Sequence, residues 1–254
     1  MKHNSESQPR LRRAAITVLC IFVLLAAGFC IYVTGSYEAA PEAQVLLESG
    51  GSGRVQIFQK DDRLIVAAPE EPEAGLILYP GGKVEPEAYV PLTDALAQQG
   101  ILCVLVKMPC NLAVFDMDAA DGIAEQFPEI KRWYIGGHSL GGAMAASYAA
   151  GHAEKLEGLL LLAAYSTEDL SGTDLRALSL YGSEDGVLNR EKYGECRKNL
   201  PADTQENVIE GGCHAYFGMY GEQEGDGKAL IAPKEQIEET ARLAAEWIKK
   251  GKTG

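Results

Sequence analysis

The most constraining feature of this 254-residue sequence is a series of short, continuous apolar runs. They read GLILY, ILCVLV, RWYIGG, LEGLLLLAAY and LRALSLYG. Such runs, without polar alternation, are typical of strands buried on both faces of a parallel sheet. Because helical patterns separate most of them, the sequence predicts an α/β fold, with a mostly parallel sheet and helices on both faces.

The segments around these runs add further elements. RVQIF and RLIVAAP flank QKDD, which predicts an antiparallel hairpin before the parallel strands. The connection STEDLSGTD is too short to hold a lid domain. Two amphipathic patterns predict helices. Their apolar positions are Val84, Ala88, Leu92 and Leu96 in the first, and Ile237, Ala241, Ala244 and Trp247 or Ile248 in the second.

An uncharged apolar run extends from Ala14 to Val33. As a helix rising about 1.5 Å per residue, it would span roughly 30 Å, the thickness of the hydrocarbon core of a bilayer. Three arginines precede it, so we expect a transmembrane anchor over 14–35, a cytoplasmic tail over 1–13 and the rest of the chain outside the cell membrane. The alternative is secretion after signal cleavage, although the apolar region of a signal peptide has typically only about 7–15 residues.

The remaining chain is expected to form a stalk and one folded domain. Residues 36–53 read as a stalk or linker that ends in a glycine-rich turn, and the domain follows over 54–254. Four of the 23 basic residues and one of the 36 acidic residues precede residue 36, which leaves 19 basic and 35 acidic ones, a net charge of −16. Such an acidic surface repels phosphate backbones, so nucleic acid is excluded as a partner.

The six cysteines give no sign of a metal site, because none of their spacings resembles a zinc motif. Outside the apolar run lie Cys103, Cys110, Cys196 and Cys213. In an oxidising compartment they could form one or two disulfides, whose pairing the sequence does not reveal. Buried thiols are at least as good an interpretation.

Ser139 lies in the motif Gly137-His138-Ser139-Leu140-Gly141, between an apolar run and a helix rich in small residues. This pattern is typical of a nucleophilic serine on a sharp strand-to-helix turn, where glycines allow strand and helix to approach closely. The alternative interpretation of this motif is a glycine-rich bend that occurs by chance and has no catalytic role. A phosphate loop of the Walker type is not indicated, since the required Lys-Ser or Lys-Thr pair is absent.

A nucleophilic serine needs a histidine base. Of the four histidines, His3 lies in the expected cytoplasmic tail and His138 lies within the serine motif itself. His152 ends the following helix, where a capping or surface role is the simpler interpretation. This leaves His214, in the loop after the strand-like segment ENVIE, as the expected base.

The carboxylate that orients this base is expected between Ser139 and His214. Asp185, in GSEDGV after an apolar run, is the preferred candidate, and Glu168 and Asp169 are the reserve. A solvated acidic turn is the alternative interpretation of this segment.

An oxyanion hole requires two backbone N–H donors. Leu140, directly after the serine, is expected to supply one of them. The second is expected from the segment YPGGKV, with Gly82 as the first choice and Lys83 as the alternative.

At these motifs the sequence resembles the compact, lidless α/β-hydrolases related to the dienelactone hydrolase group. The resemblance runs from about residue 55 to 250 and is carried by YPGGKVEPEAY, GGHSLGG, YGSEDGV and GGCHAYFGMYGEQEGDG. It implies an eight-stranded sheet, a triad of Ser139, Asp185 and His214, and no cofactor. The order serine, acid, histidine along the chain also fits the α/β-hydrolases.

Two departures limit what the resemblance implies. Dienelactone hydrolases use a cysteine nucleophile, so their lactone substrate is not carried over to this chain. Cys213 stands before His214 where an asparagine-like residue is expected, which puts the local hydrogen bonding in doubt. YGEQEGDG is also similar to the family, but the sequence gives it no chemical role.

The expected function is a serine hydrolase, membrane-anchored, that cleaves an ester bond of a small-molecule acyl substrate. Peptidase and acyltransferase activity on the same triad remain open. A non-catalytic binding module with this fold is the alternative of a different class.

Overall fold

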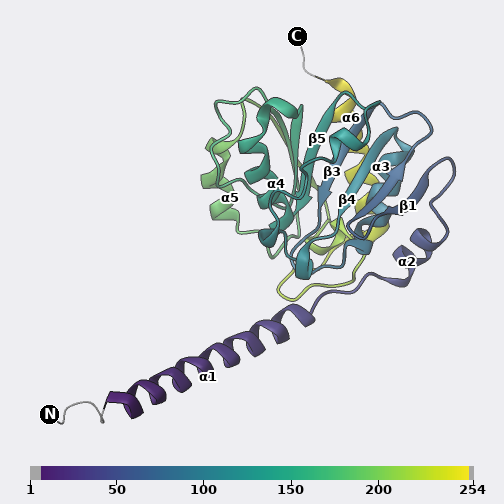
Figure 1. The fold of residues 1–254 in the computed structure, drawn as a ribbon. Helices are drawn as coiled ribbons and strands as arrows, with labels where there is room; N and C mark the ends of the chain where they lie inside the picture. Colours follow the sequence, from purple (N-terminus) through teal and green to yellow (C-terminus); the bar gives the residue numbers. More distant parts are fainter. Residues whose placement is uncertain (1–6, 252–254) are drawn as a thin grey trace. The chain divides into compact units, whose positions relative to one another are not determined.

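The computed structural model describes residues 7–251, in two compact units, Met1–Ser36 and Tyr37–Gly254. The described part of the first unit is one long helix, α1 (Ser7–Thr34) (Figure 1). Its segment Arg12–Phe29 is long and apolar enough to cross a membrane, and none of that segment is buried in the structure. A membrane anchor and a signal sequence both fit this helix. The expected tail over 1–13 begins outside the described residues.

The second unit is built around an eight-stranded sheet in the order β1-β2-β4-β3-β5-β6-β7-β8. β1 pairs with β2, and β2 with β4, in antiparallel fashion, whereas all the other neighbours are parallel. The strands are β1 (Gln56–Lys60), β2 (Leu64–Ala68), β3 (Ala74–Tyr79), β4 (Ile101–Val106), β5 (Trp133–His138), β6 (Gly158–Leu162), β7 (Arg176–Gly182) and β8 (Asp203–Ile209). The predicted hairpin, the mostly parallel sheet and its eight strands are confirmed.

The burial of each strand explains how well it could be predicted from the sequence. Every residue of β3, β4, β5 and β6 is buried, which is why these strands are continuous apolar runs. β8 lies at the edge of the sheet and buries only Ile209 fully. Its polar sequence, DTQENVI, therefore gives a much weaker strand signal.

Helices cover both faces of the sheet, as predicted (Figure 1). One core layer contains side chains of α2 (Pro41–Glu48), α3 (Val90–Gln98) and α6 (Pro233–Lys250). The other contains Ala145, Ala146 and Ala149 of α4 (Leu140–Gly151). A fifth helix of this unit, α5 (Arg190–Cys196), is held to β7 by a 2.8 Å hydrogen bond between the hydroxyls of Tyr193 and Ser179. All residues predicted to form the apolar faces of the two amphipathic helices are buried. The first helix is shorter than predicted, because α3 begins only at Val90, with Pro91 in its first turn. Val84 forms an isolated bridge with Tyr37, and Ala88 lies in a 3₁₀ turn.

The stalk expected over 36–53 differs from the structure, which places a helix there. α2 packs into the core of the second unit, with Ala43 fully buried and Ala39 nearly so. The cause is visible in the sequence only afterwards: Pro41 stands in the first turn, where its fixed φ favours helix initiation, and small alanines allow close packing. The folded unit therefore begins at Tyr37 rather than near residue 54.

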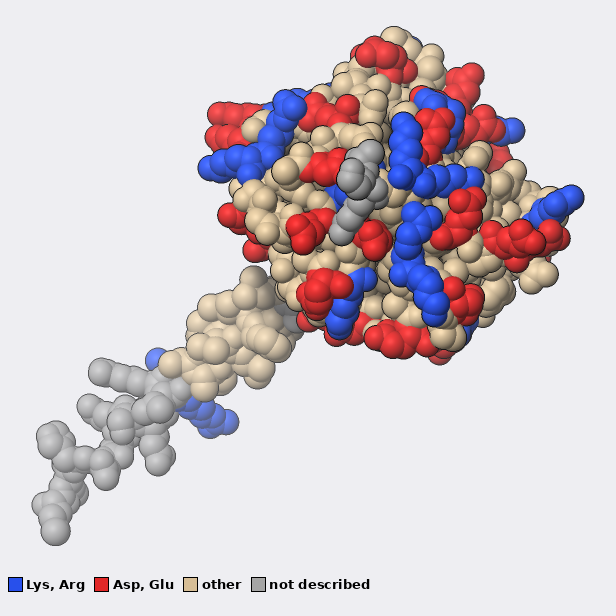
Figure 2. Space-filling model, turned by 90° about the horizontal axis from the view of Figure 1, so that it is seen from above, with Lys and Arg blue, Asp and Glu red and all other residues tan. Residues whose placement is uncertain are grey.

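Cys20, Cys103, Cys110, Cys196 and Cys213 are free thiols. Cys103 and Cys213 are buried, Cys196 is half-buried and Cys110 is exposed, so the buried-thiol interpretation holds for two of the four. On the face shown in Figure 2, lysine and arginine side chains are interspersed with acidic ones. Arg242, for example, pairs with Glu239 and Glu246.

Candidate active site

Ser139 occupies the sharp turn between β5 and α4. Its backbone has φ 52° and ψ −121°, a conformation that residues other than glycine rarely adopt. Hydrogen bonds hold it there: Ser139 N donates to Leu162 O at 2.9 Å, and Ser139 O accepts from Ala143 N at 3.1 Å. A Cβ on Gly141 would lie only 2.1 Å from Pro80 O, so the glycine is needed for close approach. This strained strand-to-helix turn is the geometry that the motif predicts.

Asp185 and His214 form a buried pair at the carboxyl end of the sheet. His214 Nδ1 lies 2.9 Å from Asp185 Oδ2, and both side chains are almost completely buried. Asp185 Oδ1 accepts the backbone N–H groups of Val187 and Leu188, at 2.9 and 2.8 Å, which fixes the carboxylate. An ionised carboxylate only accepts, so Nδ1 donates to it, and the other ring nitrogen of His214 faces away from the acid.

The structure brings Asp185 and His214 together but shows no hydrogen bond between His214 Nε2 and Ser139. This Nε2 atom is buried and has no partner within the described part of the chain. The two loops nevertheless meet, because the ring of His138, the residue before Ser139, lies 4.6 Å from the ring of His214. Catalytic hydrogen bonds are often long or open until substrate binds, so this separation is compatible with a triad.

The reserve acids serve other roles. Asp169 Oδ1 accepts the backbone N–H and the hydroxyl of Ser171, within its own loop. The backbone of Glu168 is held by Ser166. Only Asp185 among the three candidates contacts His214. His152 stacks on Tyr148 at the end of α4, in agreement with the structural role expected for it.

Backbone hydrogen bonds distinguish the two candidates for the second oxyanion donor, Gly82 and Lys83. Lys83 N donates to Asn111 O at 2.7 Å, so this amide is already engaged. The amide of Gly82 has no such partner among residues 7–251. Gly82 also lies against the strand-to-helix turn of Ser139, since a Cβ built on it would be 2.9 Å from Leu140 Cδ2. Leu140 N is in the first turn of α4, where amides lack intrahelical acceptors.

A buried tyrosine–histidine pair holds the loop that contains Gly82, and the sequence did not predict this pair. Tyr89 Oη accepts the N–H of Gly81 at 3.0 Å and lies 2.7 Å from His138 Nδ1. Burial, and next the charge of His214, lower the pKa of His138 well below its ordinary value. His138 is therefore neutral, and its Nδ1 shares one hydrogen bond with the hydroxyl of Tyr89. The only signal in the sequence was a histidine inside the serine motif.

Cys213 does not disturb the histidine loop. Its backbone N–H donates to Gln236 Oε1 at 2.9 Å, and its carbonyl accepts from Gln236 Nε2 at 2.8 Å. Gln236 projects from α6 and is completely buried. Its amide thus supplies the hydrogen bonding that the cysteine side chain lacks. Burial first, and then Asp226, raise the pKa of Cys213 to about 12, so the thiol is not a nucleophile.

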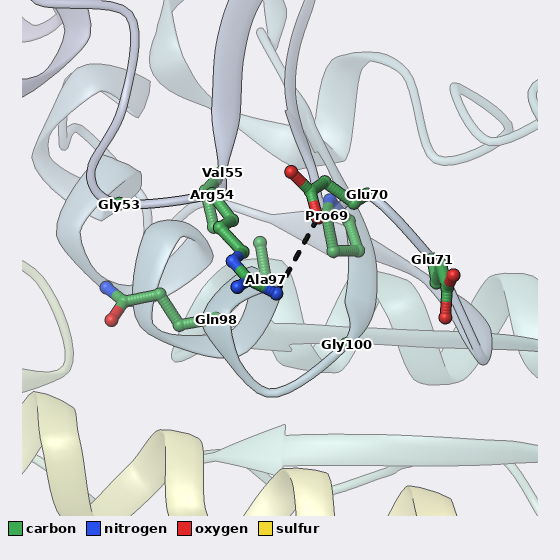
Figure 3. A pocket seen from close by; sticks show the side chains of 9 residues that line it. All are labelled: Gly53, Arg54, Val55, Pro69, Glu70, Glu71, Ala97, Gln98 and Gly100. Carbon is green, nitrogen blue, oxygen red and sulfur yellow. Dashed lines mark ion pairs between the residues drawn. The ribbon is translucent and has the colours of Figure 1, made fainter.

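A hollow of the second unit away from Ser139 lacks this chemistry. It is shown in Figure 3, beside the start of β4 and the end of α3, at the opposite end of the parallel strands. Its lining contains no histidine, serine or cysteine, and its Arg54–Glu70 ion pair is 3.9 Å long and highly exposed. Within the described chain, no group of three or more potential ligands is arranged to hold a metal ion.

Comparison with known proteins identifies the family. The model of the alpha/beta hydrolase family matches residues 75–238, more than half of the chain. Among solved structures, the dienelactone hydrolase of Anabaena variabilis is 15% identical and covers 78% of this chain and 99% of its own, with a TM-score of 0.58. Est1E of Butyrivibrio proteoclasticus is 14% identical, covers 78% and 100%, and has a TM-score of 0.55. At these identities the two structures show a shared fold.

No curated protein sequence matches the chain. The family match nevertheless agrees with the short connection between β6 and β7, which leaves no lid over the carboxyl end of the sheet. The chain therefore belongs to the alpha/beta hydrolase family.

Proposed function

We propose that the protein is a serine hydrolase that cleaves an ester bond through an acyl-enzyme intermediate on Ser139. One observation carries this proposal: the buried Asp185–His214 pair leaves His214 Nε2 without a partner, next to the strained turn that bears Ser139. A buried polar atom without a hydrogen bond is costly in a structural role. It is expected where a reacting group is to be bound.

The chemistry follows from these groups. His214 Nε2 takes the proton of Ser139 Oγ as the oxygen attacks the acyl carbon, and Asp185 stabilises the resulting imidazolium. His214 then returns this proton to the departing alkoxide, and the acyl group stays on Ser139. Water, deprotonated by the same nitrogen, releases the acid and regenerates the serine.

The tetrahedral intermediates carry an oxyanion, for which we propose the amides of Leu140 and Gly82. The free amide of Gly82 and its packing against Leu140 support this choice over Lys83. The start of α4 adds the positive end of its helix dipole. Loss of one such donor typically lowers kcat by roughly 10²–10³-fold.

An ester is favoured over a peptide by the surroundings of the loop after β4. Leu112 lies against Gly82, and the exposed apolar side chains of Val114, Phe115 and Met117 follow it. These residues suit an apolar acyl or alcohol group, and no lid restricts access to them. Peptidase and acyltransferase activity are the alternatives on the same triad.

We also propose that α1 anchors the protein in the cell membrane, with the second unit outside. Its support is the apolar segment Arg12–Phe29 and the arginines before it. Resistance to carbonate extraction, with digestion of the second unit by protease added to intact cells, would agree with this topology. Recovery of a shortened, soluble chain would instead show signal cleavage.

Labelling with a fluorophosphonate probe tests the hydrolase proposal. The full chain, in mild detergent, is compared with Ser139→Ala and His214→Ala, and with His152→Ala as a matched histidine control outside the site. We expect labelling of the wild type and of His152→Ala only, followed by turnover of short-chain esters. Absence of labelling in folded wild-type protein would favour the non-catalytic module.

A further inference from the structure

The carboxylate of Asp226 joins three loops at the candidate active site. Asp226 Oδ1 accepts the backbone N–H groups of Gly186 at 3.1 Å, His214 at 3.1 Å and Gly227 at 2.8 Å. Asp226 Oδ2 accepts the N–H of Ala215 at 2.8 Å. Gly186 directly follows the acid Asp185, and His214 is the base itself. One side chain thus holds the backbones that carry both members of the acid–base pair.

The packing of these loops leaves no room for larger side chains. A Cβ on Gly186 would lie 2.7 Å from Gly225 O, and one on Gly227 would lie 1.8 Å from Glu184 O. The acid loop and the Asp226 turn therefore touch backbone to backbone. The acid loop is also bonded to the histidine loop, since Glu184 N donates to Gly212 O at 2.8 Å. Asp226 sits where the three backbones converge.

The charge of Asp226 suits this role. Although burial alone would raise its pKa, the amides of Ala215, Gly186 and His214 lower the pKa of Asp226 below its ordinary value. The side chain is therefore a carboxylate at neutral pH and offers acceptors only. An asparagine of the same shape would turn an NH₂ group toward backbone donors, so at least one of the four amides would lose its acceptor.

We infer that Asp226 is a positioning residue: it sets the distance and orientation between Asp185 and His214 by holding their loops together. This inference rests on the proposed function, in which that pair activates Ser139. It also gives a role to the segment YGEQEGDG, which had none in the sequence. Because Asp226 acts through the loops that carry Asp185 and His214, its loss should act on the chemical step rather than on binding.

The test compares Asp226→Asn with Asp94→Asn in the full chain. Asp94 is a matched control, because its carboxylate also joins distant segments but lies away from the site. It accepts hydrogen bonds from Ser52 N at 3.1 Å and from Gln98 Nε2 at 2.7 Å. Since a misplacement of about 1 Å can cost roughly 10²-fold in rate, we expect Asp226→Asn to lower kcat for a short-chain ester by about 10–100-fold at unchanged KM. Asp94→Asn should lower only thermal stability.

The second readout needs no activity. The Nδ1–H proton of His214, bonded to Asp185, should give a downfield proton NMR resonance that is lost in His214→Ala. We expect this resonance to weaken or move in Asp226→Asn and to stay unchanged in Asp94→Asn. If the wild type neither labels nor turns over esters, the proposed function fails, while the resonance still decides whether Asp226 positions the pair.

Wild-type kcat and an unchanged resonance in folded Asp226→Asn would overturn the inference. Should this variant fail to fold, Asp226→Glu takes its place, because it keeps the charge but displaces it by one methylene. We expect a lower kcat at the same KM and a shifted resonance. Wild-type values of both would equally contradict the inference.

Discussion

The backbone strain at Ser139 leads to a prediction about stability. With φ 52° and ψ −121°, this residue occupies a region that glycine enters freely and that costs other residues about 1–3 kcal/mol. Replacing Ser139 by glycine removes both the nucleophilic oxygen and the strain. Replacing it by alanine removes the oxygen alone. The comparison of the two variants therefore measures the strain together with the greater conformational freedom of glycine.

The expected magnitude follows from two opposing effects. Relief of strain favours the glycine variant by about 1–3 kcal/mol, whereas the greater freedom of glycine in the unfolded chain disfavours it by about 0.4–1 kcal/mol. The free energy of unfolding of Ser139→Gly should therefore exceed that of Ser139→Ala by about 1–2 kcal/mol. For a domain of this size, each kcal/mol of unfolding free energy shifts Tm by about 2–4 °C, so the Tm values of the two variants should differ by about 2–8 °C.

Differential scanning calorimetry of the two full-length variants, in the same detergent and buffer, measures this difference. Fluorophosphonate labelling should be absent from both. The reasoning would be refuted if Ser139→Gly melted at or below the temperature of Ser139→Ala, because the turn would then store no strain. A gain in stability with the loss of the nucleophile would instead show that the serine is kept at a cost to the fold.

Three further predictions concern the surroundings of the site. Gly82→Ala places a Cβ 2.9 Å from Leu140 Cδ2, closer than the about 3.5–4.0 Å of a favourable contact, and should displace the Gly82 amide and lower kcat for short esters by roughly 10²-fold with little change in Tm. Tyr89→Phe leaves buried partners unsatisfied, so urea unfolding should show a loss of about 1–3 kcal/mol. Since burial lowers the pKa of His138, only the unfolded chain takes up its proton near pH 6.5. Stability should therefore fall as pH drops below about 6.5, by up to ~1.4 kcal/mol per pH unit, and less steeply in His138→Gln.

The sequence predicts best what is local. Continuous apolar runs identify the buried strands, since a strand covered on both faces has no polar positions. The glycines around Ser139 identify the turn, because a close approach of strand and helix excludes side chains. Asp185 could be preferred over Asp169 from its place in the strand-end turn GSEDGV, and the structure puts only the former beside His214. By contrast, the sequence of α2 resembles a stalk, because its short apolar stripe becomes a core face only when it packs against the sheet.

Contacts between segments far apart in the chain carry no comparable signal. Tyr89 reaches His138 across 49 positions, and Gln236 reaches Cys213 across 23. Asp226 is the sharpest case, because a carboxylate in a polar, glycine-rich segment looks like a solvated turn. It acquires a role only when folding brings four backbone N–H groups around it. The residues that perform the proposed chemistry can thus be found from motifs, whereas those that hold them in place are defined by the assembled fold.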